Sequence, residues 1–343
     1  DTSYEVVLPS KPTASEEFAA LELVEYFFKV TGQTLEIKYD SGIFLTKQST
    51  YISIGNTSIY SSSKKEHNYD LSREALNTDG YVIYTYGSNI VINAYCDRGK
   101  LYGVYEFVED TLGVKFLNYR YTHVEEQDVI NLYKMDNLRI PYFQQRAYLN
   151  TPVFHHDTEY VRHMRFNTDY CPVDETNGGY TEWCQYNGNT SHTMVDIVPN
   201  KNYIVPGQYD SLGNPLIQEE YREIFAHEGH GSALVQSWLN HASLLDYCFT
   251  SGVNDDGTYD DSNPINLVHM TIESLKKFIL ANPNCENYMI GQNDTPAGCT
   301  CDRCSEAVRK YHGGGRMIRF INLVSDGIKA WLEEIGSDRI INF

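Results

Sequence analysis

Three cysteines, Cys299, Cys301 and Cys304, form a C-x-C-x-x-C motif shortly after the dipeptide Asn293-Asp294. Thiolates at this spacing suit a structural zinc ion if a fourth ligand comes from elsewhere in the chain. Disulfide bonds and buried packing thiols are the alternatives, and the spacing alone does not decide among the three. A catalytic redox C-x-x-C belongs to a thioredoxin-like fold, which is not the architecture predicted here. In each case we expect the motif to brace the loop that carries Asp294.

The fourth zinc ligand has several candidates, and no second C-x-x-C motif distinguishes among them. The candidates are Cys171, Cys184, Cys248, Cys285 and His312. A zinc-dependent hydrolase would require an ion with an open coordination position in place of a closed cysteine site. The HEGH segment at residues 227–230 does not supply one, because its histidines are three residues apart and the zincin motif places them four apart. We predict a polar helix end or loop there.

Asn293 and Asp294 directly follow the apolar run YMIGQ at residues 288–292, which we predict to be a strand. In a parallel α/β barrel, catalytic groups are carried by the loops that follow the strands. Glycoside hydrolysis needs a carboxylic acid that protonates the leaving oxygen, so we predict that Asp294 is a general acid and that Asn293 binds a sugar hydroxyl. The alternative is that Asp294 caps the following loop. The candidates for the second carboxylate of a catalytic pair are Asp174, Glu175 and Asp196. Each of them could equally be a solvated loop acid.

Three further side chains are candidates for substrate binding. His192 lies in NTSHT (189–193), which resembles a Gly-His-Ser-type loop that follows a strand in a barrel family, and a neutral imidazole there could bond a sugar hydroxyl or a carboxylate. Arg146 could pair through its bidentate guanidinium with the carboxylate of an acidic sugar. Trp183 lies in an aromatic-rich stretch and could stack on a sugar ring. Each has a structural alternative, namely an imidazole that orients its loop, a buried salt bridge and ordinary packing.

Length and composition limit the classes of partner. The chain has 343 residues, which suggests about two domains, each with its own core. Its net charge of -19 argues against a nucleic-acid partner, because phosphate binding needs a basic face. No apolar segment approaches the roughly 20 residues that cross a bilayer, so we expect no membrane insertion. The 28 tyrosines suit stacking on sugars, and a carbohydrate is the expected partner. The oligomeric state is not predicted.

The two ends of the sequence carry expectations of their own. The opening DTSYEVVLPSK has neither a charged n-region nor an apolar h-region, so we expect any signal peptide to have been removed or never to have been present. We expect the protein to be secreted, periplasmic or on the cell surface, with a cytoplasmic location as the alternative. A complete barrel needs eight strand–helix units, whereas the pattern after Pro141 predicts four or five strands. We therefore expect the sequence to be the N-terminal part of a longer chain, with an open half-barrel as the alternative.

Residues 1–120 have the pattern of a small α+β sandwich domain. Apolar residues at helical spacing predict a helix over residues 15–31, with Ser15 as its N-cap. Alternating strand-like runs on either side of a Gly-Ser-Asn turn predict a hairpin over residues 80–95. A second helix is predicted over residues 101–113. Strands and helices in this order indicate the α/β class.

The pattern changes after a polar segment, residues 121–142, which we predict to be a linker. Residues 143–343 contain short apolar strands that alternate with helices, which indicates a parallel sheet with right-handed crossovers. We predict a strand over residues 193–199 and helices over residues 263–283 and 316–336. This pattern is that of the N-terminal portion of a (β/α)8 barrel.

Two family resemblances become specific at this point. The N-terminal segment resembles the accessory α/β domain of family 20 hexosaminidases and family 67 α-glucuronidases, through SEEFAALELVEYF, YISIG and DRGKLYGVYEFVEDTLGVKFL (97–117). The second half resembles a bacterial barrel family grouped with glycoside hydrolases, domain of unknown function 4838. The carrying motifs are RFN (165–167), NTSHT (189–193), and QND with its C-x-C-x-x-C and the GRMIRFIN helix. The resemblance implies an α/β sandwich followed by an incomplete (β/α)8 TIM-type barrel.

The resemblance also implies a function, and this chain departs from the family 20 pattern at one pair of residues. Family 20 enzymes carry an Asp-Glu pair where this chain has Asn293-Asp294, and an amide cannot supply the charge that polarises an N-acyl group. This argues against hexosaminidase activity. In family 67 the partner carboxylates come from later strands, which would place them beyond Phe343. We predict hydrolysis of a glycosidic bond with Asp294 as general acid. The alternative is a non-catalytic glycan-binding protein that uses the barrel mouth as a cleft; two carboxylates about 5–10 Å apart across the mouth would discriminate the two.

Overall fold

The structure is a computed structural model in which the chain divides into two compact units, Asp1–Thr181 and Glu182–Phe343. It describes the following residues: 4–46, 48–147, 157–167, 175–179, 183–184, 186, 192–209, 211, 215–226, 246–293 and 298–343. Residues 121–142, predicted to be a linker, contribute two strands to the first unit, β7 (Tyr121–His123) and β8 (Asp136–Arg139). No helix in these described ranges is long and apolar enough to cross a membrane.

The first unit is built on a mixed six-stranded sheet with the strand order β2-β1-β3-β5-β4-β8. The first four strands in this order are parallel neighbours, and β4 pairs antiparallel with both β5 and β8. Strands β4 and β5 form the predicted hairpin. The remaining elements are β1 (Glu5–Leu8), α1 (Ala14–Thr31), β2 (Glu36–Tyr39), β3 (Tyr51–Ile54), α2 (Ser58–Ser63), β4 (Tyr81–Tyr86), β5 (Asn89–Ala94), α3 (Asp97–Leu112), β6 (Lys115–Asn118) and α5 (Thr158–His163).

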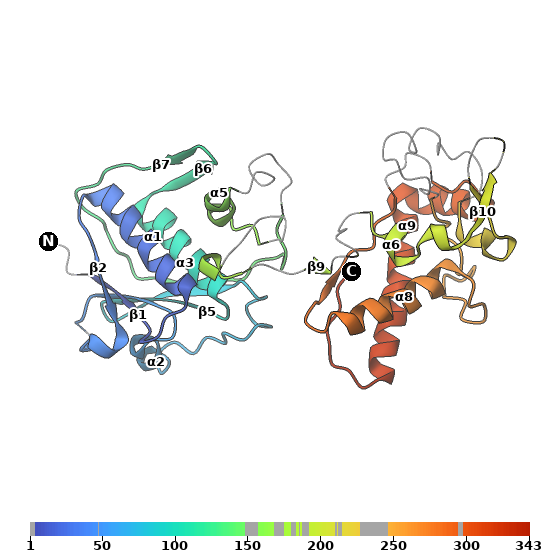
Figure 1. The fold of residues 1–343 in the computed structure, drawn as a ribbon. Coiled ribbons are helices and arrows are strands. Elements are labelled where there is room, and N and C mark those ends of the chain that lie inside the picture. The colour runs from blue at the N-terminus through green and yellow to red at the C-terminus, as the bar shows by residue number, and fades with distance from the viewer. Residues whose placement is uncertain are drawn as a thin grey trace. The chain divides into compact units, whose positions relative to one another are not determined.

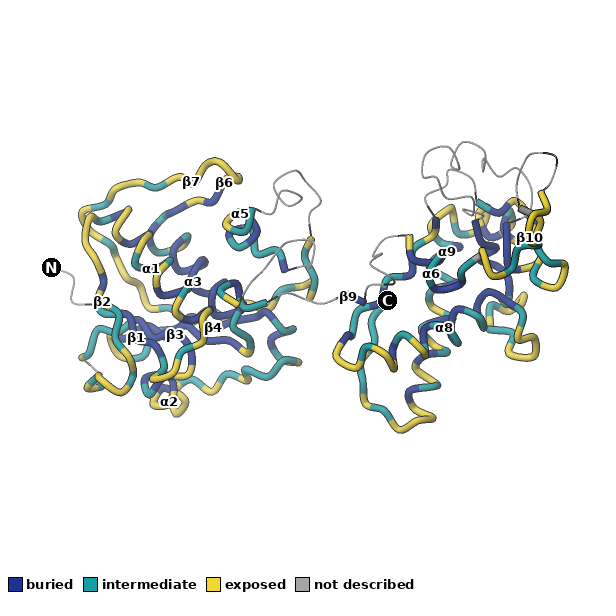
Figure 2. The backbone as a smooth tube through the Cα atoms, in the orientation of Figure 1, coloured by how far each residue is buried: buried dark blue, intermediate teal, exposed yellow. Residues whose placement is uncertain are grey.

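Side chains along the central strands alternate between two apolar cores. Val6 and Leu8 of β1 belong to the larger core, which they share with α1 and α3. Val7 belongs to the smaller core, together with Ile59 and Tyr60 of α2. Figure 1 shows α1 and α3 on one face of the sheet and α2 on the other. Because both faces are covered, the central strands are buried on both sides, as the dark blue strands of Figure 2 show.

Both long helices of this unit begin earlier than predicted, because other residues cap them. The N-cap of α1 is Thr13 and not Ser15, which lies buried inside the helix. Thr13 and Glu16 form a capping box, in which each side chain accepts the backbone N–H of the other residue. Helix α3 starts at Asp97, because the Sγ of Cys96 accepts the backbone N–H three residues later, at 3.4 Å. The helices themselves are confirmed.

The second unit is centred on two helices, α8 and α9, whose apolar faces share one core. Both predicted helices are confirmed, although α9 begins earlier and is interrupted at His312, where φ is +61°. Two strand pairs accompany them, β9 with β12 in parallel and β10 with β11 in antiparallel orientation. The bounds are β9 (Trp183–Cys184), α6 (Met194–Ile197), β10 (Ile204–Tyr209), β11 (Pro215–Ile217), α8 (Leu267–Ala281), β12 (Asn287–Tyr288) and α9 (Asp302–Glu334).

Two expectations for this unit differ from the structure. The strand predicted over residues 193–199 was wrong, because its centre forms the short helix α6, which buries Met194 and Ile197. Short apolar runs do not distinguish a buried strand from a buried helical turn. Within the described part of the second unit, parallel pairing consists of β9 with β12 and a bridge between Asn287 and Asn342. A (β/α)8 barrel is therefore not evident in the part of the unit that the structure describes.

Candidate functional site

The chain that leaves β12 is fastened to the start of α6 by Thr193. The Oγ1 of Thr193 donates to the carbonyl of Met289 at 2.8 Å and accepts the N–H of Gly291 at 2.9 Å. The N–H of Met194 donates to the carbonyl of Gly291 at 3.0 Å. Thr193 is buried, so water does not compete for these bonds. This stretch therefore has a fixed path toward Asn293.

His192 and Asn293, two of the predicted substrate ligands, flank this path. The Nδ1 of His192 lies 3.1 Å from the carbonyl oxygen of Gln292. A carbonyl can only accept, so Nδ1 carries the hydrogen and Nε2 of the neutral ring is an acceptor. The imidazole is exposed, whereas Asn293 is buried. Thr193, which holds the path, was not singled out from the sequence, although it belongs to the same NTSHT motif as His192.

The remaining sequence candidates are scattered. Four of them fall outside the residues that the structure describes: Asp294, Asp174, Cys171 and the HEGH segment 227–230. Trp183 lies in β9, where its backbone pairs with Asn287 of β12. Glu175 begins a short 3-10 turn in the first unit, and Asp196 lies in α6. The second carboxylate of a catalytic pair is therefore not identified among the described residues.

Arg146 lies in the first unit, where its guanidinium pairs with the buried carboxylate of Asp79 at 2.7 Å. Arg98 donates to Oδ1 of Asp79 at 2.8 Å. Asn167 donates at 2.6 Å to Oδ2, the oxygen that Arg146 also contacts. Burial by itself would raise the pKa of Asp79, but the charges of Arg98 and Arg146 and their hydrogen bonds lower it below its ordinary value. Of the two interpretations of Arg146, the buried salt bridge is the one present, and a sugar carboxylate would have to compete with Asp79.

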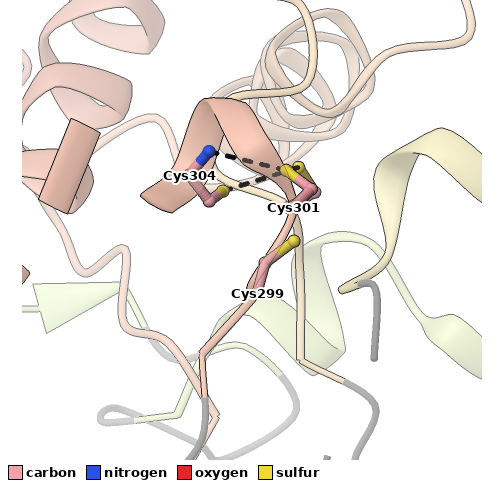
Figure 3. A group of neighbouring side chains, drawn as sticks. Cys299, Cys301 and Cys304 are labelled. Atoms are coloured by element: carbon pink, nitrogen blue, oxygen red, sulfur yellow. Dashed lines mark hydrogen bonds between the residues drawn. The ribbon is translucent and has the colours of Figure 1, made fainter. Parts of the chain in front are cut away.

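Four sulfur atoms converge at the start of α9, those of Cys248, Cys299, Cys301 and Cys304, all within 4.8 Å of one another. The Sγ of Cys248 is 3.9 Å from that of Cys301 and 3.7 Å from that of Cys304. These distances exceed the roughly 2.05 Å of a disulfide, and no disulfide joins the described cysteines. Figure 3 shows the three sulfurs of the motif together. The other fourth-ligand candidates in the described chain lie outside the cluster: Cys184, Cys285 and His312.

Hydrogen bonds order the thiols within this cluster. Cys301 is the N-cap of α9, and its Sγ accepts the N–H of Cys304 at 3.5 Å. Hydrogen bonds from Cys248 and Cys299, helped by the hydroxyl of Thr250 at 3.2 Å, lower the pKa of the Cys304 thiol. Hydrogen bonds of the Cys248 thiol with the sulfurs of Cys299 and Cys304, together with burial, raise the pKa of Cys248. The cluster therefore favours a thiolate at Cys304 hydrogen-bonded by its neighbours.

A buried cation and a buried acid lie beside the thiols. Arg316 of α9 donates to the carbonyl of Cys299 at 3.1 Å, and its guanidinium carbon lies 5.7 Å from the ring centre of Phe249. Gly298 permits this approach, because a Cβ there would meet the Arg316 Nη2 at 2.5 Å. Burial raises the pKa of Asp246 to about 6. Four soft thiol donors beside a buried guanidinium suit a structural metal such as zinc, which this cluster could bind.

Comparison with protein families matches two segments of the chain. Residues 2–107 match the family model described as Glycosyl hydrolase family 67 N-terminus, which spans β1 to most of α3. Residues 262–332 match Domain of unknown function (DUF4838), which spans α8, β12 and most of α9 with the C-x-C-x-x-C motif. No curated protein matches the chain. The chain thus joins a segment similar to the N-terminus of family 67 glycosyl hydrolases to a segment similar to DUF4838, and the resemblance stated from the sequence motifs is confirmed.

Proposed function

We propose that this chain is part of a carbohydrate-active enzyme that hydrolyses a glycosidic bond. The observation that carries the proposal is the match of residues 2–107 to the family 67 N-terminus. This segment folds as the sheet domain of the first unit, with helices on both faces. A domain shared with glycosyl hydrolases favours a sugar substrate. In this proposal the site that cleaves the glycosidic bond lies outside that domain, in the second unit of the chain.

We place that site on the second unit, as the N-terminal portion of a (β/α)8 barrel. Three parallel segments support this: β9, β12 and the bridged Asn342. Helix α8 precedes β12 and α9 follows it, which is the strand–helix alternation of a barrel. Barrel enzymes build their active sites from the loops after the strands, so the residues that follow β12 belong to the proposed site.

Asp294 is the proposed general acid. It directly follows Asn293, at the end of the path that is hydrogen-bonded to the start of α6. A protonated carboxyl at this position can donate its hydrogen to the departing oxygen as the glycosidic bond breaks. In this proposal Asn293 and His192 bind sugar hydroxyls, with Nε2 of His192 as an acceptor, and Trp183 stacks on a sugar ring.

The test compares Asp294→Asn with the wild type in the full-length protein, on aryl glycosides whose leaving groups differ in acidity. We expect a loss of at least about a hundredfold on poor leaving groups and a much smaller loss on activated ones, because only the former need a proton. Asp338→Asn, at an exposed position of the same unit, is the control and should keep wild-type rates. Equal losses on all leaving groups would mean that Asp294 only holds its loop. Glycan binding without turnover by the wild type would favour the glycan-binding alternative.

A further inference from the structure

We propose that Cys248, Cys299, Cys301 and Cys304 bind one zinc ion in a closed, structural site. The four sulfurs come from two segments of the chain, and three of them are buried. The inference goes beyond the proposed glycosidase activity and does not depend on it, because it is based on the geometry and chemistry of the thiols alone.

The sulfur spacing fits a single tetrahedral ion. With Zn–S distances of about 2.3 Å, a tetrahedron holds its sulfurs about 3.8 Å apart. The Sγ of Cys248 lies 3.9 Å from Cys301 and 3.7 Å from Cys304. An iron–sulfur cluster, in which several irons separate the ligating sulfurs, would need a wider arrangement than sulfurs that all lie within 4.8 Å of one another. The spacing therefore favours one ion, and the soft thiolates favour zinc over oxygen-seeking magnesium or calcium.

The surroundings of the cluster offset part of the charge of such a site. Four thiolates and one zinc ion leave two negative charges in excess, which cannot be buried without positive partners. Arg316 is buried and bonded to the backbone of Cys299. The N–H of Cys304 points at the Sγ of Cys301, and the hydroxyl of Thr250 lies 3.2 Å from the Sγ of Cys304. Such groups orient the ligands and stabilise thiolates in metal sites.

The ligand set assigns the ion a structural role. Four protein ligands leave no open coordination position for water or substrate, so the site is not that of a zinc-dependent hydrolase. The ion would join the start of α9 to the segment around Cys248, which is 53 positions away from Cys301. That segment is itself anchored by backbone hydrogen bonds. The N–H of Cys248 donates to the carbonyl of Ile224 at 3.0 Å, and the N–H of Ala226 donates to the backbone carbonyl of Asp246 at 2.9 Å. The site would thus tie together three segments of the second unit.

Metal analysis of the wild type and two variants tests the proposal. Wild-type protein purified without added metal should contain about one zinc per chain. The zinc content of Cys248→Ser should be lower by at least about fivefold. Cys285→Ser is the matched control, because Cys285 is also a buried cysteine of the second unit but lies outside the cluster. It should keep its zinc. Less than about 0.2 zinc per chain in the wild type would overturn the proposal, and iron in place of zinc would overturn the identity of the ion.

A second measurement does not require a variant to fold. Cobalt added to chelator-treated wild-type protein should give the visible absorption of a tetrahedral cobalt–thiolate complex, and zinc should abolish it by competition. Chelation should also speed alkylation of the four cluster thiols, measured by mass spectrometry, while Cys96 of the first unit keeps its alkylation rate. An absorption typical of oxygen ligation, or alkylation rates that chelation leaves unchanged, would contradict the assignment.

Discussion

Cys96 and Cys301 occupy the same local position in the two units, and the groups around them differ. Each is the N-cap of a helix, and each Sγ accepts the N–H of the residue three positions later, at 3.4 Å for Cys96 and 3.5 Å for Cys301. Cys96 lies 3.6 Å from the carboxylate of Asp79, in a cluster of ionised side chains. Cys301 lies among three other sulfurs. The same capping arrangement therefore serves two different kinds of buried polar cluster.

The difference between the two clusters is their charge balance. The carboxylate of Asp79 is neutralised by Arg98 and Arg146 from its own chain, so the cluster needs no added ion. Burial, together with the nearby carboxylate, raises the pKa of Cys96 to about 11, which keeps this cysteine a neutral thiol. The thiol cluster has four soft donors beside Arg316 and gains from a divalent cation. In our proposal, Cys301 is a metal ligand because other thiols are packed against it, and Cys96 is not.

Replacing the two capping cysteines gives the largest expected contrast. Cys301→Ser should destabilise the second unit by about 5 kcal/mol or more, since structural zinc contributes on the order of 10–16 kcal/mol in small folds. Cys96→Ser should change stability by less than about 1 kcal/mol, because serine is a good N-cap. All three tryptophans, Trp183, Trp238 and Trp331, belong to the second unit, so their fluorescence during denaturation measures the effect of Cys301→Ser, and hydrogen exchange of first-unit peptides measures that of Cys96→Ser. Equal effects of the two substitutions would remove the distinction.

Asp79→Asn should have the next largest effect, in the first unit. It leaves the guanidinium groups of Arg98 and Arg146 without their shared carboxylate, and breaking such a buried ion pair costs about 3–5 kcal/mol. Hydrogen exchange of first-unit peptides should show the loss, while tryptophan fluorescence of the second unit stays unchanged. Asp110→Asn, at an exposed position of α3, is the control. A loss below about 1 kcal/mol would mean that the two arginines do not depend on this carboxylate.

The smallest effect is a pH dependence of the first unit. The pKa of Asp79 is lower in the folded unit than its unfolded value of about 3.9. Its contribution to stability is therefore complete above the unfolded pKa and is lost as the pH falls through the folded pKa, by at most about 1.4 kcal/mol per pH unit. Urea unfolding of the first unit at a series of acidic pH values measures this slope. The stability gap between wild type and Asp79→Asn should narrow on acidification, and a constant gap would contradict the lowered pKa.

Features that depend on close neighbours could be predicted from the sequence. The periodicity of apolar residues predicted α1, α3, α8 and α9, because a helix is specified by side chains three and four positions apart. The β4–β5 hairpin followed from two strand-like runs around one short turn. Three of the four thiols were recognisable for the same reason, since they lie within six residues. Helix starts were less accurate, and Thr13 rather than Ser15 caps α1 because only Thr13 has Glu16 three positions ahead.

Only the tertiary structure decided which distant groups meet. The sequence does not distinguish Cys248 from Cys285 as the fourth thiol. Cys248 belongs to the cluster because its segment packs against the start of α9. Arg146 reads equally as a ligand for a sugar acid or as a partner of a buried carboxylate, until the fold brings it to Asp79, 67 positions away. Thr193 gains its role from the segment that follows β12, where Met289 lies 96 positions later in the chain. Such pairings are set by how whole segments pack together, and the residue types within each segment alone do not specify them.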